Sequence, residues 1–298
     1  MRLRNDATVP FTFDGVTYHG VAGETLAAAL IGNGVKLVAR SFKYHRPRGI
    51  MGSGSEEPNA LVTIGRGADA EPNVRATVQE VYAGLDAFSQ NAWPTLKHDA
   101  MAVNDLASPF LGAGFYYKTF MWPKAFWEKL YEPIIRRAAG LGGLSGAPDA
   151  DTHEKPYAFC DVLVIGGGPA GLMAGLVAAT AGADVIIADE DSAFGGRLLA
   201  EVEQIDGKPA QEWVTATVAR LQAMPNVRMM TRTTVTGAYD QGTFGALERV
   251  DAKELKSSFW RIVAKRSILC AGALERGIAF PNNDRPGIMM AGAVRAYV

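Results

Sequence analysis

Hydrophobic and polar residues alternate over short runs in the first part of the chain. The run PFTFDGVTYHG places aromatic and β-branched residues on both sides of the turn dipeptide Asp14-Gly15, as in a β-hairpin. LAAALIGNG then predicts a short helix that ends at the glycines between Gly32 and Gly34, and residues 61–67 predict a further strand. A hairpin, a helix and later strands indicate a small β-grasp domain, to which we assign residues 1–95.

The pattern changes over residues 96–157, which are rich in aromatic residues, proline and glycine. We expect the aromatic side chains to pack helices and loops against neighbouring domains rather than to form a ligand cage, because no polar residues converge on them. Exposed aromatic clusters also favour interfaces. Residues 140–156 have the composition of a linker. The aromatic residues concerned are Phe115, Tyr116, Phe120, Trp122, Phe126, Trp127 and Tyr131.

A strand–turn–helix–strand pattern opens the third region, residues 158–298. The apolar run VLVI at residues 162–165 is typical of a buried parallel strand and leads directly into GGGPAG. Gly166 permits the sharp turn out of the strand, Gly168 leaves room for a pyrophosphate, and Gly171 allows the helix to pack closely on the strand. The region therefore predicts an α/β, Rossmann-like dinucleotide-binding domain.

Two further features belong to this nucleotide-binding pattern. Pro169 suits the first helical turn, and with Ala170 it begins a helix whose free N–H groups and dipole form an anion site. An acid that accepts hydrogen bonds from the ribose hydroxyls is expected at the end of the second strand. That strand is Val185–Ala188, so Asp189 fits the spacing best and Glu190 is the second candidate.

Later segments narrow the class of nucleotide-binding domain. FGGR follows the acid closely, as in flavin-linked dinucleotide domains rather than simple dehydrogenases, and its Arg197 is either a phosphate contact or a solvated surface charge. WRIVAKRSILCAGALER predicts a pair of strands that ends in CAGA, with Gly272 in the turn back toward the nucleotide.

A basic run precedes these motifs, in the first domain. It forms either a solvated face or a contact with another subunit or an anion, and both interpretations stay open at this stage. Its members are Arg40, Lys43, His45, Arg46 and Arg48.

Composition and charge exclude several function classes. The 298 residues are 48% hydrophobic and 20% charged with a formal net charge of −1, which points to neither nucleic acid nor an anionic membrane. The two cysteines, Cys160 and Cys270, are too far apart in sequence to indicate a thiol pair or a zinc site. No signal peptide and no apolar run of about 18 residues is present, so we expect a soluble, cytoplasmic protein.

No catalytic residue and no metal site is assigned to this chain. The histidines show no ligand spacing, and we expect them at the surface or in capping roles. The adjacent carboxylates Glu56-Glu57 and Asp189-Glu190 make poor acid–base pairs, because neighbours on a strand face opposite ways. No nucleophilic arrangement is recognisable. The histidines are His19, His45, His98 and His153.

One segment resembles a known family closely. RSFKYHRPRGIMGSGSEEPNALV is similar to the loop of the 2Fe–2S ferredoxin-like domain that precedes the nucleotide domain in amine-oxidising complexes. Relatives that hold the cluster have cysteines spaced C-x4-C-x2-C, at positions that are Gly52, Glu57 and Ala60 here. Iron–sulfur clusters require thiolates, so we expect a ferredoxin-like domain without cluster ligands.

The cysteine-free loop, together with GFYYKTFMWP, FGGRL and AGALERGIAFPNNDRPGIMMAGAVR, resembles the alpha subunits of heterotetrameric sarcosine oxidases over essentially the whole chain. The resemblance implies NAD in the dinucleotide-binding domain, FAD and FMN elsewhere in the complex, and beta, gamma and delta subunits as partners. It also implies that Val235 offers its backbone to the adenine. In the family, sarcosine is oxidised, oxygen becomes hydrogen peroxide and tetrahydrofolate captures the one-carbon unit.

Two alternatives remain open. The chain could belong to another amine-oxidising complex, of the opine or proline dehydrogenase type, with FAD in this site, although those relatives normally carry the cluster. It could also be a non-catalytic scaffold that docks partners. Because the sequence stops at Val298, shortly after a helix begins, we expect an incomplete dinucleotide-binding domain and a fragment of a longer subunit.

Overall fold

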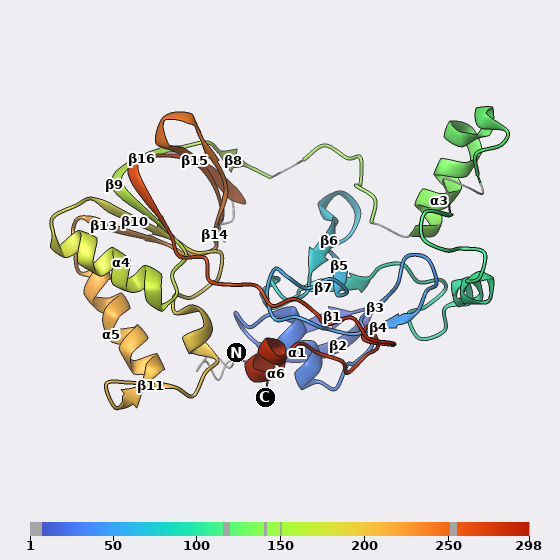
Figure 1. The fold of residues 1–298 in the computed structure, drawn as a ribbon, viewed down its shortest axis with the longest axis horizontal. Coiled ribbons are helices and arrows are strands. Elements are labelled where there is room, and N and C mark those ends of the chain that lie inside the picture. The colour runs from blue at the N-terminus through green and yellow to red at the C-terminus, as the bar shows by residue number, and fades with distance from the viewer. Residues whose placement is uncertain (1–7, 116–119, 140–141, 150, 251–254, 298) are drawn as a thin grey trace. The chain divides into compact units, whose positions relative to one another are not determined.

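The computed structural model describes residues 8–115, 120–139, 142–149, 151–250 and 255–297 of the chain (Figure 1). They form two compact units, the first of Met1–Pro148 with Glu275–Val298 and the second of Asp149–Leu274. This division differs from the predicted one, which placed residues 158–298 in a single domain. The structure instead places residues 275–298 in the first unit, because residues 282–297 form hydrogen bonds there with the basic run and the loop that follows it.

The first unit is built on a five-stranded sheet with the order β2-β1-β7-β5-β6. Strand β1 pairs antiparallel with β2 and parallel with β7, and this arrangement with one helix over the sheet confirms the expected β-grasp fold. A second small hairpin joins β3 to β4. The elements are β1 (Thr8–Phe13), β2 (Val16–Val21), α1 (Leu26–Gly32), β3 (Ala39–Arg40), β4 (Pro47–Arg48), β5 (Leu61–Ile64), β6 (Glu71–Arg75) and β7 (Asp86–Ser89).

Helix α1 shows why the local sequence adopts this structure. The Thr25 hydroxyl accepts a hydrogen bond from the Ala28 N–H at the start of the helix, and the Asn33 N–H donates to the Ala29 carbonyl at its end. Leu26 and Leu30, one turn apart, are fully buried in the core of the sheet. The predicted helix is therefore confirmed, with its end at Gly32.

After β7 the first unit continues through residues 96–148, the aromatic-rich connector. Several of its aromatic rings contact one another: the Phe120 ring lies edge-to-face with Phe115 and tilted against Tyr131, with centroids 5.8 and 5.2 Å apart. Trp122, by contrast, is 84% exposed. Tyr116 of the predicted aromatic cluster and residues 140, 141 and 150 of the predicted linker lie outside the described residues. The helical elements are η2 (Ala100–Ala107), η3 (Lys124–Phe126), η4 (Trp127–Tyr131) and α3 (Glu132–Ala139).

The second unit contains a sheet with the strand order β13-β10-β9-β16-β15-β14. Strands β13, β10, β9 and β16 run parallel, whereas β14, β15 and β16 are joined antiparallel. The short strand β8 pairs with the start of β16. The elements are β8 (His153–Glu154), β9 (Tyr157–Ile165), α4 (Pro169–Thr180), β10 (Val185–Ala188), η5 (Gly196–Leu199), β11 (Gln204–Ile205), β12 (Lys208–Pro209), α5 (Ala210–Gln222), β13 (Val227–Met230), β14 (Thr233–Tyr239), β15 (Thr243–Arg249) and β16 (Ser257–Leu269).

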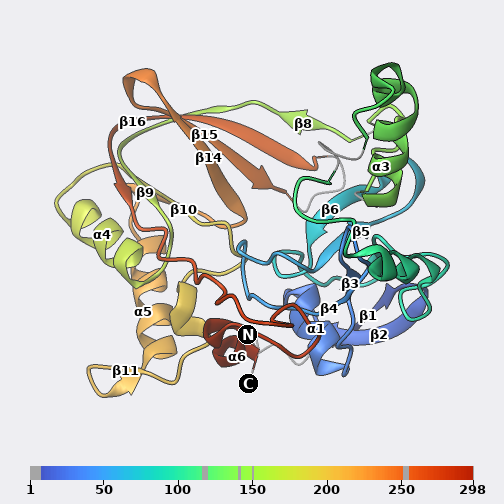
Figure 2. The ribbon, with the colours of Figure 1, turned by 45° about the vertical axis from the view of Figure 1, so that its right-hand side comes forward.

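Two buried clusters hold this sheet, one on each face. Helices α4 and α5 cover one face, where Leu172 and Leu221 pack against Val164 and Ile187 (Figure 2). On the other face, Leu163 and Ile262 pack with residues of β15. Because both faces are covered, β9 and β10 read as continuous apolar runs rather than as alternating ones.

One strand prediction was wrong. The segment WRIVAKRSILC does not form a strand pair but lies within and just after a single long strand, β16. Its first half pairs antiparallel with β15, and its second half continues alongside β9 up to Leu269. The segment contains no glycine or proline that would turn the chain, so pairing on both sides keeps it extended.

The chain ends with α6 (Ala291–Tyr297), which belongs to the first unit. The Glu275 carboxylate accepts hydrogen bonds from the N–H groups of Ala291 and Gly292 at the start of this helix. Over the part of the chain that the structure describes, none of the helices is both long enough and apolar enough to cross a bilayer.

Candidate dinucleotide-binding site

The glycine turn lies between the end of β9 and the start of α4. Gly166 has φ +103°, which favours glycine, and a Cβ added to it would lie 2.4 Å from the Cys270 carbonyl oxygen. A Cβ on Gly171 would lie 1.8 Å from the Gly166 carbonyl oxygen. Both glycines are therefore required by close backbone packing, and Gly171 acts as the sequence analysis predicted.

Gly168 differs from its neighbours in the turn. It is the residue that precedes α4, and a Cβ added to it would meet no atom of the described residues within 4 Å. Pro169 is the first residue of the helix, and the first hydrogen bond of the turn runs from the Leu172 N–H to the Gly168 carbonyl. The N–H groups of Ala170 and Gly171 therefore have no acceptor within the helix, which is the arrangement that binds anions.

The carboxylate of Asp189 contacts this turn directly. One oxygen accepts a hydrogen bond from the Gly167 N–H, and the other accepts one from the Asp191 N–H at 2.8 Å. Ionised carboxylates offer about four lone-pair positions, so acceptor capacity remains for ribose hydroxyls. The neighbouring Glu190 is exposed. Of the two acids that the sequence left open, the structure brings Asp189 to the glycine turn.

The FGGR segment packs on the same turn. The Gly195 N–H donates to the Gly167 carbonyl at 2.9 Å, and a Cβ on Gly196 would lie 3.1 Å from Gly168 Cα. Phe194 is buried and covers Gly167. The guanidinium of Arg197 instead forms an ion pair with Glu201, at 3.3 Å, and its side chain is mostly exposed. The glycines thus support the turn, while Arg197 pairs with Glu201, four residues farther along the chain.

Two further segments meet the carboxyl ends of β9 and β10. The Thr233 N–H donates to the Asp189 carbonyl at 2.7 Å, which places the start of β14 beside the acid. Val235 is two residues farther along β14, the last strand of the sheet path, and is half-buried. Strands at the edge of a sheet leave backbone N–H and C=O groups unpaired, as a backbone contact with a base requires.

The end of β16 approaches from the other side. The Cys270 N–H donates to the Ile165 carbonyl at 2.7 Å, so the CAGA segment continues past the glycine turn. Gly272 is exposed with φ +69°, and an added Cβ would meet no atom of the described residues within 4 Å. The sequence predicted this return but missed that the Cys270 carbonyl is what requires glycine at Gly166. Only the pairing of β16 with β9 could show that contact.

Neither cysteine is poised for chemistry. Burial raises the pKa of the Cys160 thiol to about 11, and burial also raises the pKa of Cys270. Thiolates are the reactive form of cysteine, so both thiols are unreactive near neutral pH. In the described part of the chain, no three His, Cys, Asp or Glu side chains are grouped so that they could hold a metal ion.

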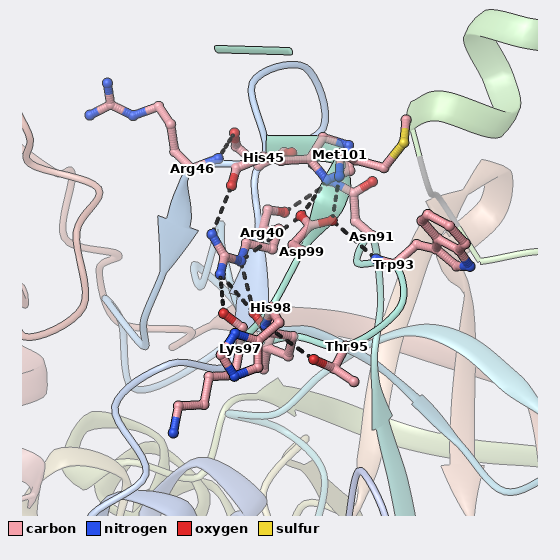
Figure 3. A network of polar contacts seen from close by, with 12 residues as sticks. Arg40, His45, Arg46, Asn91, Trp93, Thr95, Lys97, His98, Asp99 and Met101 are labelled. Atoms are coloured by element: carbon pink, nitrogen blue, oxygen red, sulfur yellow. Dashed lines mark hydrogen bonds and ion pairs between the residues drawn. The ribbon is translucent and has the colours of Figure 1, made fainter. Parts of the chain in front are cut away.

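The basic run serves the interior of the first unit, which neither open interpretation described. Arg40 donates to the carbonyls of Leu96 and His45, and His45 lies 2.6 Å from the Asp99 carboxylate (Figure 3). His45 is 3% exposed, so the expected surface or capping role was wrong for this histidine. It is buried because the loop between β3 and β4 folds back on Asp99.

The remaining basic residues fix other segments. Arg46 donates through Nε and Nη2 to both oxygens of Asp284, at 3.0 and 2.9 Å, and Arg48 lies 3.2 Å from the same carboxylate. Lys43 donates to the Leu111 carbonyl. The charges of the run are therefore largely paired with distant parts of the first unit. Asp284 was the functional partner that sequence reasoning missed, since it is more than two hundred residues away.

Comparison with protein families agrees with this division of the chain. Residues 6–92 match the model of a 2Fe-2S iron-sulfur cluster binding domain, and residues 161–269 match that of the FAD-dependent oxidoreductases. The chain is 58% identical to the sarcosine oxidase subunit alpha of Rhizobium meliloti (strain 1021), over 98% of this chain and 31% of that protein. It is a homologue of the N-terminal part of sarcosine oxidase subunit alpha.

One further relative supports this assignment, and one solved structure supports the fold. The sarcosine oxidase subunit alpha of Corynebacterium sp. (strain P-1) is 35% identical, over the whole of this chain and 27% of that protein. The chain thus spans less than a third of the curated relatives it matches. The crystal structure of L-proline dehydrogenase from P. horikoshii aligns with a TM-score of 0.60 and 20% identity, over 96% of this chain and 45% of that one. The predicted family resemblance and fold class are confirmed.

The matching cluster-binding model does not fit the residues in the loop of this chain. Gly52, Glu57 and Ala60 occupy the positions of the expected thiolates, and neither cysteine of the chain lies in the first unit. The dinucleotide of the second model, by contrast, fits the turn described above: space at Gly168, free N–H groups at the start of α4 and an acid at the end of β10.

Proposed function

We propose that the second unit binds the adenosine diphosphate half of a dinucleotide, within an amine-oxidising flavoenzyme complex that acts on sarcosine. The observation that carries this proposal is the convergence of Gly168, the start of α4 and Asp189 at the carboxyl ends of two neighbouring parallel strands. Ligands of open α/β sheets bind at that edge.

Each residue of the turn has a proposed part in binding. The pyrophosphate lies over Gly168, where it accepts hydrogen bonds from the N–H groups of Ala170 and Gly171 and is favoured by the helix dipole. Gly166 and Pro169 set the path of the backbone. Asp189 accepts hydrogen bonds from the ribose hydroxyls.

The residues around this centre complete the proposed site. Val235 and Gly272 offer backbone groups at its two sides. Arg197 reaches a phosphate only by leaving Glu201, so we assign it a secondary role. Glu190, being exposed, contributes charge rather than a direct contact.

NAD and FAD both contain the adenosine diphosphate half that this site is proposed to bind. The family resemblance described in the sequence analysis implies NAD, whereas the matching model is described as an FAD-dependent oxidoreductase and favours FAD. We propose NAD. When bound, either group supplies hydride-transfer chemistry, and this chain's own residues bind and orient its adenosine end.

The rest of the catalytic cycle is proposed from the same homology. The chain acts with beta, gamma and delta subunits, in a complex that also holds FAD and FMN. The complex converts sarcosine to glycine with hydrogen peroxide and passes the one-carbon unit to tetrahydrofolate. Exposed apolar side chains of the connector, among them Phe110 and Trp122, favour a docking role for the first unit in such an assembly.

Identification of the released nucleotide tests the cofactor proposal. The chain is purified with its genomic neighbours, denatured, and the released small molecules are separated and weighed by mass spectrometry. We expect one NAD for each alpha chain. Absence of NAD, with one FAD more for each alpha chain than the flavin-bearing partners account for, would replace NAD by FAD. Release of NADP would overturn the role of Asp189, because a carboxylate there repels a 2′-phosphate.

The same preparation tests the function of the complex. Sarcosine-dependent production of hydrogen peroxide, with copurifying flavin-bearing partners, is the expected result. Oxidation of opines or proline in place of sarcosine would move the assignment to the related dehydrogenases. Stable assembly with full activity after the nucleotide site is disrupted would make the chain a scaffold.

A further inference from the structure

The loop that corresponds to an iron–sulfur loop contains a buried carboxylate. Glu57 is 1% exposed, and its carboxylate accepts hydrogen bonds from four backbone N–H groups. One oxygen accepts from Met51 at 2.8 Å and from Gly52 at 2.5 Å. The other accepts from Asn59 at 2.7 Å and from Ala60 at 3.0 Å.

These donors mark where the anion lies. Gly52 and Ala60, whose N–H groups point at the carboxylate, are themselves two of the three positions that carry cysteines in cluster-binding relatives, and Glu57 is the third. A concave set of backbone N–H groups favours a negative charge at its centre. The loop has therefore kept an anion-binding backbone, and a side chain of the loop itself supplies the anion.

Energetics explain why the carboxylate remains there. An ionised carboxylate out of water is costly unless hydrogen bonds replace its hydration, and Glu57 receives them on both oxygens. The neighbouring Glu56 is only half-buried and accepts from the N–H groups of Ser53 and Gly54. Glu57 thus fills the interior of the loop, while Glu56 closes its outer turn.

Other segments rest on the loop so formed. Thr77 donates its buried hydroxyl to the Gly54 carbonyl at 2.6 Å. The Met290 N–H donates to the Met51 carbonyl, and the Tyr297 hydroxyl donates to the Gly52 carbonyl. Burial, together with the negative charges of Glu57 and Glu56, raises the pKa of Tyr297. The loop thus holds residues 290–297 by these hydrogen bonds.

We infer that the Glu57 carboxylate takes the place of the iron–sulfur cluster as the anion that organises this loop. The first unit has in this way exchanged a redox centre for a fixed charge. It carries no electron at this position and instead anchors α6 to the β-grasp fold.

Anion rescue tests this inference. Glu57→Ala removes the carboxylate and leaves its space, so backbone hydrogen exchange should become at least about tenfold faster in peptides spanning residues 49–62 and 290–297. Formate, which is small enough to enter, should restore protection in a saturable way. Peptides of the second unit report the general effect of salt, and sodium chloride at matched ionic strength controls for screening.

Matched variants make the result decisive. Glu56→Gln removes the same charge from the outer turn and should change exchange in these peptides less than threefold. Glu57→Gln keeps the shape but turns two N–H donors toward an amide nitrogen, so exchange should rise without response to formate. If Glu57→Ala does not fold, the comparison of Glu57→Gln with Glu56→Gln decides. Equal exchange in the two Gln variants, or no rescue of a folded Glu57→Ala by formate, would overturn the inference.

Discussion

The Asp189 carboxylate accepts a hydrogen bond from the Gly167 N–H, which ties the acid at the end of β10 to the glycine turn after β9. The contact joins residues that directly follow the neighbouring parallel strands β9 and β10. It holds the carboxylate beside the space at Gly168 before any nucleotide binds. The acid therefore fixes the turn, and in the proposed site it also accepts the ribose hydroxyls.

Substitution of Asp189 distinguishes its role from that of its neighbour Glu190. Asp189→Asn should weaken binding of the dinucleotide by about tenfold or more, since hydrogen bonds to a charged group contribute about 1.5–3 kcal/mol. Glu190→Gln removes the same charge from an exposed side chain and should weaken binding less than about threefold. Isothermal titration with the nucleotide identified from the complex measures both. A larger loss in Glu190→Gln would assign the ribose contact to Glu190.

Substitutions at two glycines of the turn should have different effects, one on nucleotide binding and the other on folding. Gly168→Val should abolish nucleotide binding while the fold persists, because the new side chain points into space that the pyrophosphate needs. Gly171→Ala should instead unfold the second unit, because its Cβ would clash with the Gly166 carbonyl. Circular dichroism and mass spectrometry of the released nucleotide report the two outcomes. A Gly168→Val chain that retains full nucleotide would show that the assigned turn is not the binding site.

Stability should fall at high pH because of a buried thiol. Burial raises the pKa of Cys160 from 9.0 to about 11, so the folded state holds its proton where the unfolded state has lost it. The stabilisation is complete below about pH 9 and is lost as the pH rises toward 11. In urea titrations of the second unit, Cys160→Ala should remove this part of the pH dependence, and Cys270→Ala should remove less. An unchanged pH profile in Cys160→Ala would contradict the assignment.

The ion pair between Arg46 and Asp284 should anchor the last segment. Burial alone would raise the pKa of Asp284, but the hydrogen bond from Arg46 and the charges of Arg48 and Arg46 outweigh this effect, so the pKa lies below its ordinary value. The stabilisation is therefore present above the ordinary carboxyl pKa of 3.8 and is lost as the pH falls through the lower folded value.

Two variants test this anchor. Asp284→Asn should destabilise the first unit by about 1–3 kcal/mol, because it leaves two arginines beside a neutral group. Arg46→Lys, which keeps the charge but loses the two-pronged contact, should cost less. Limited proteolysis near residue 280 gives a local measure. Identical cleavage rates in the wild-type chain and Asp284→Asn would show that the anchor is dispensable.

Iron analysis tests the loop independently of folding. The purified chain should contain no stoichiometric iron or acid-labile sulfide, because Gly52, Glu57 and Ala60 supply no thiolate. A visible cluster spectrum with stoichiometric iron would contradict this prediction and the anion role of Glu57 together.

Sequence alone determined the features that depend on neighbouring residues. The apolar run before GGGPAG, the helix that follows it and the acid after the second strand are encoded within thirty or so positions, because strand and helix periods and glycine turns are local properties. The family motif at residues 52–60 likewise showed which thiolates are absent.

Only the tertiary structure decided which distant groups meet. It brought Asp189 and not Glu190 to the glycine turn and joined β16 into one strand that brings the Cys270 carbonyl to Gly166. It also turned the basic run into internal anchors for Asp99 and Asp284. It also buried Glu57 among four N–H groups, whereas the sequence showed only that Glu57 stands at a position without the expected thiolate. These outcomes depend on burial and on hydrogen bonds between segments up to 238 positions apart, for which the periodicity of a single segment carries no signal.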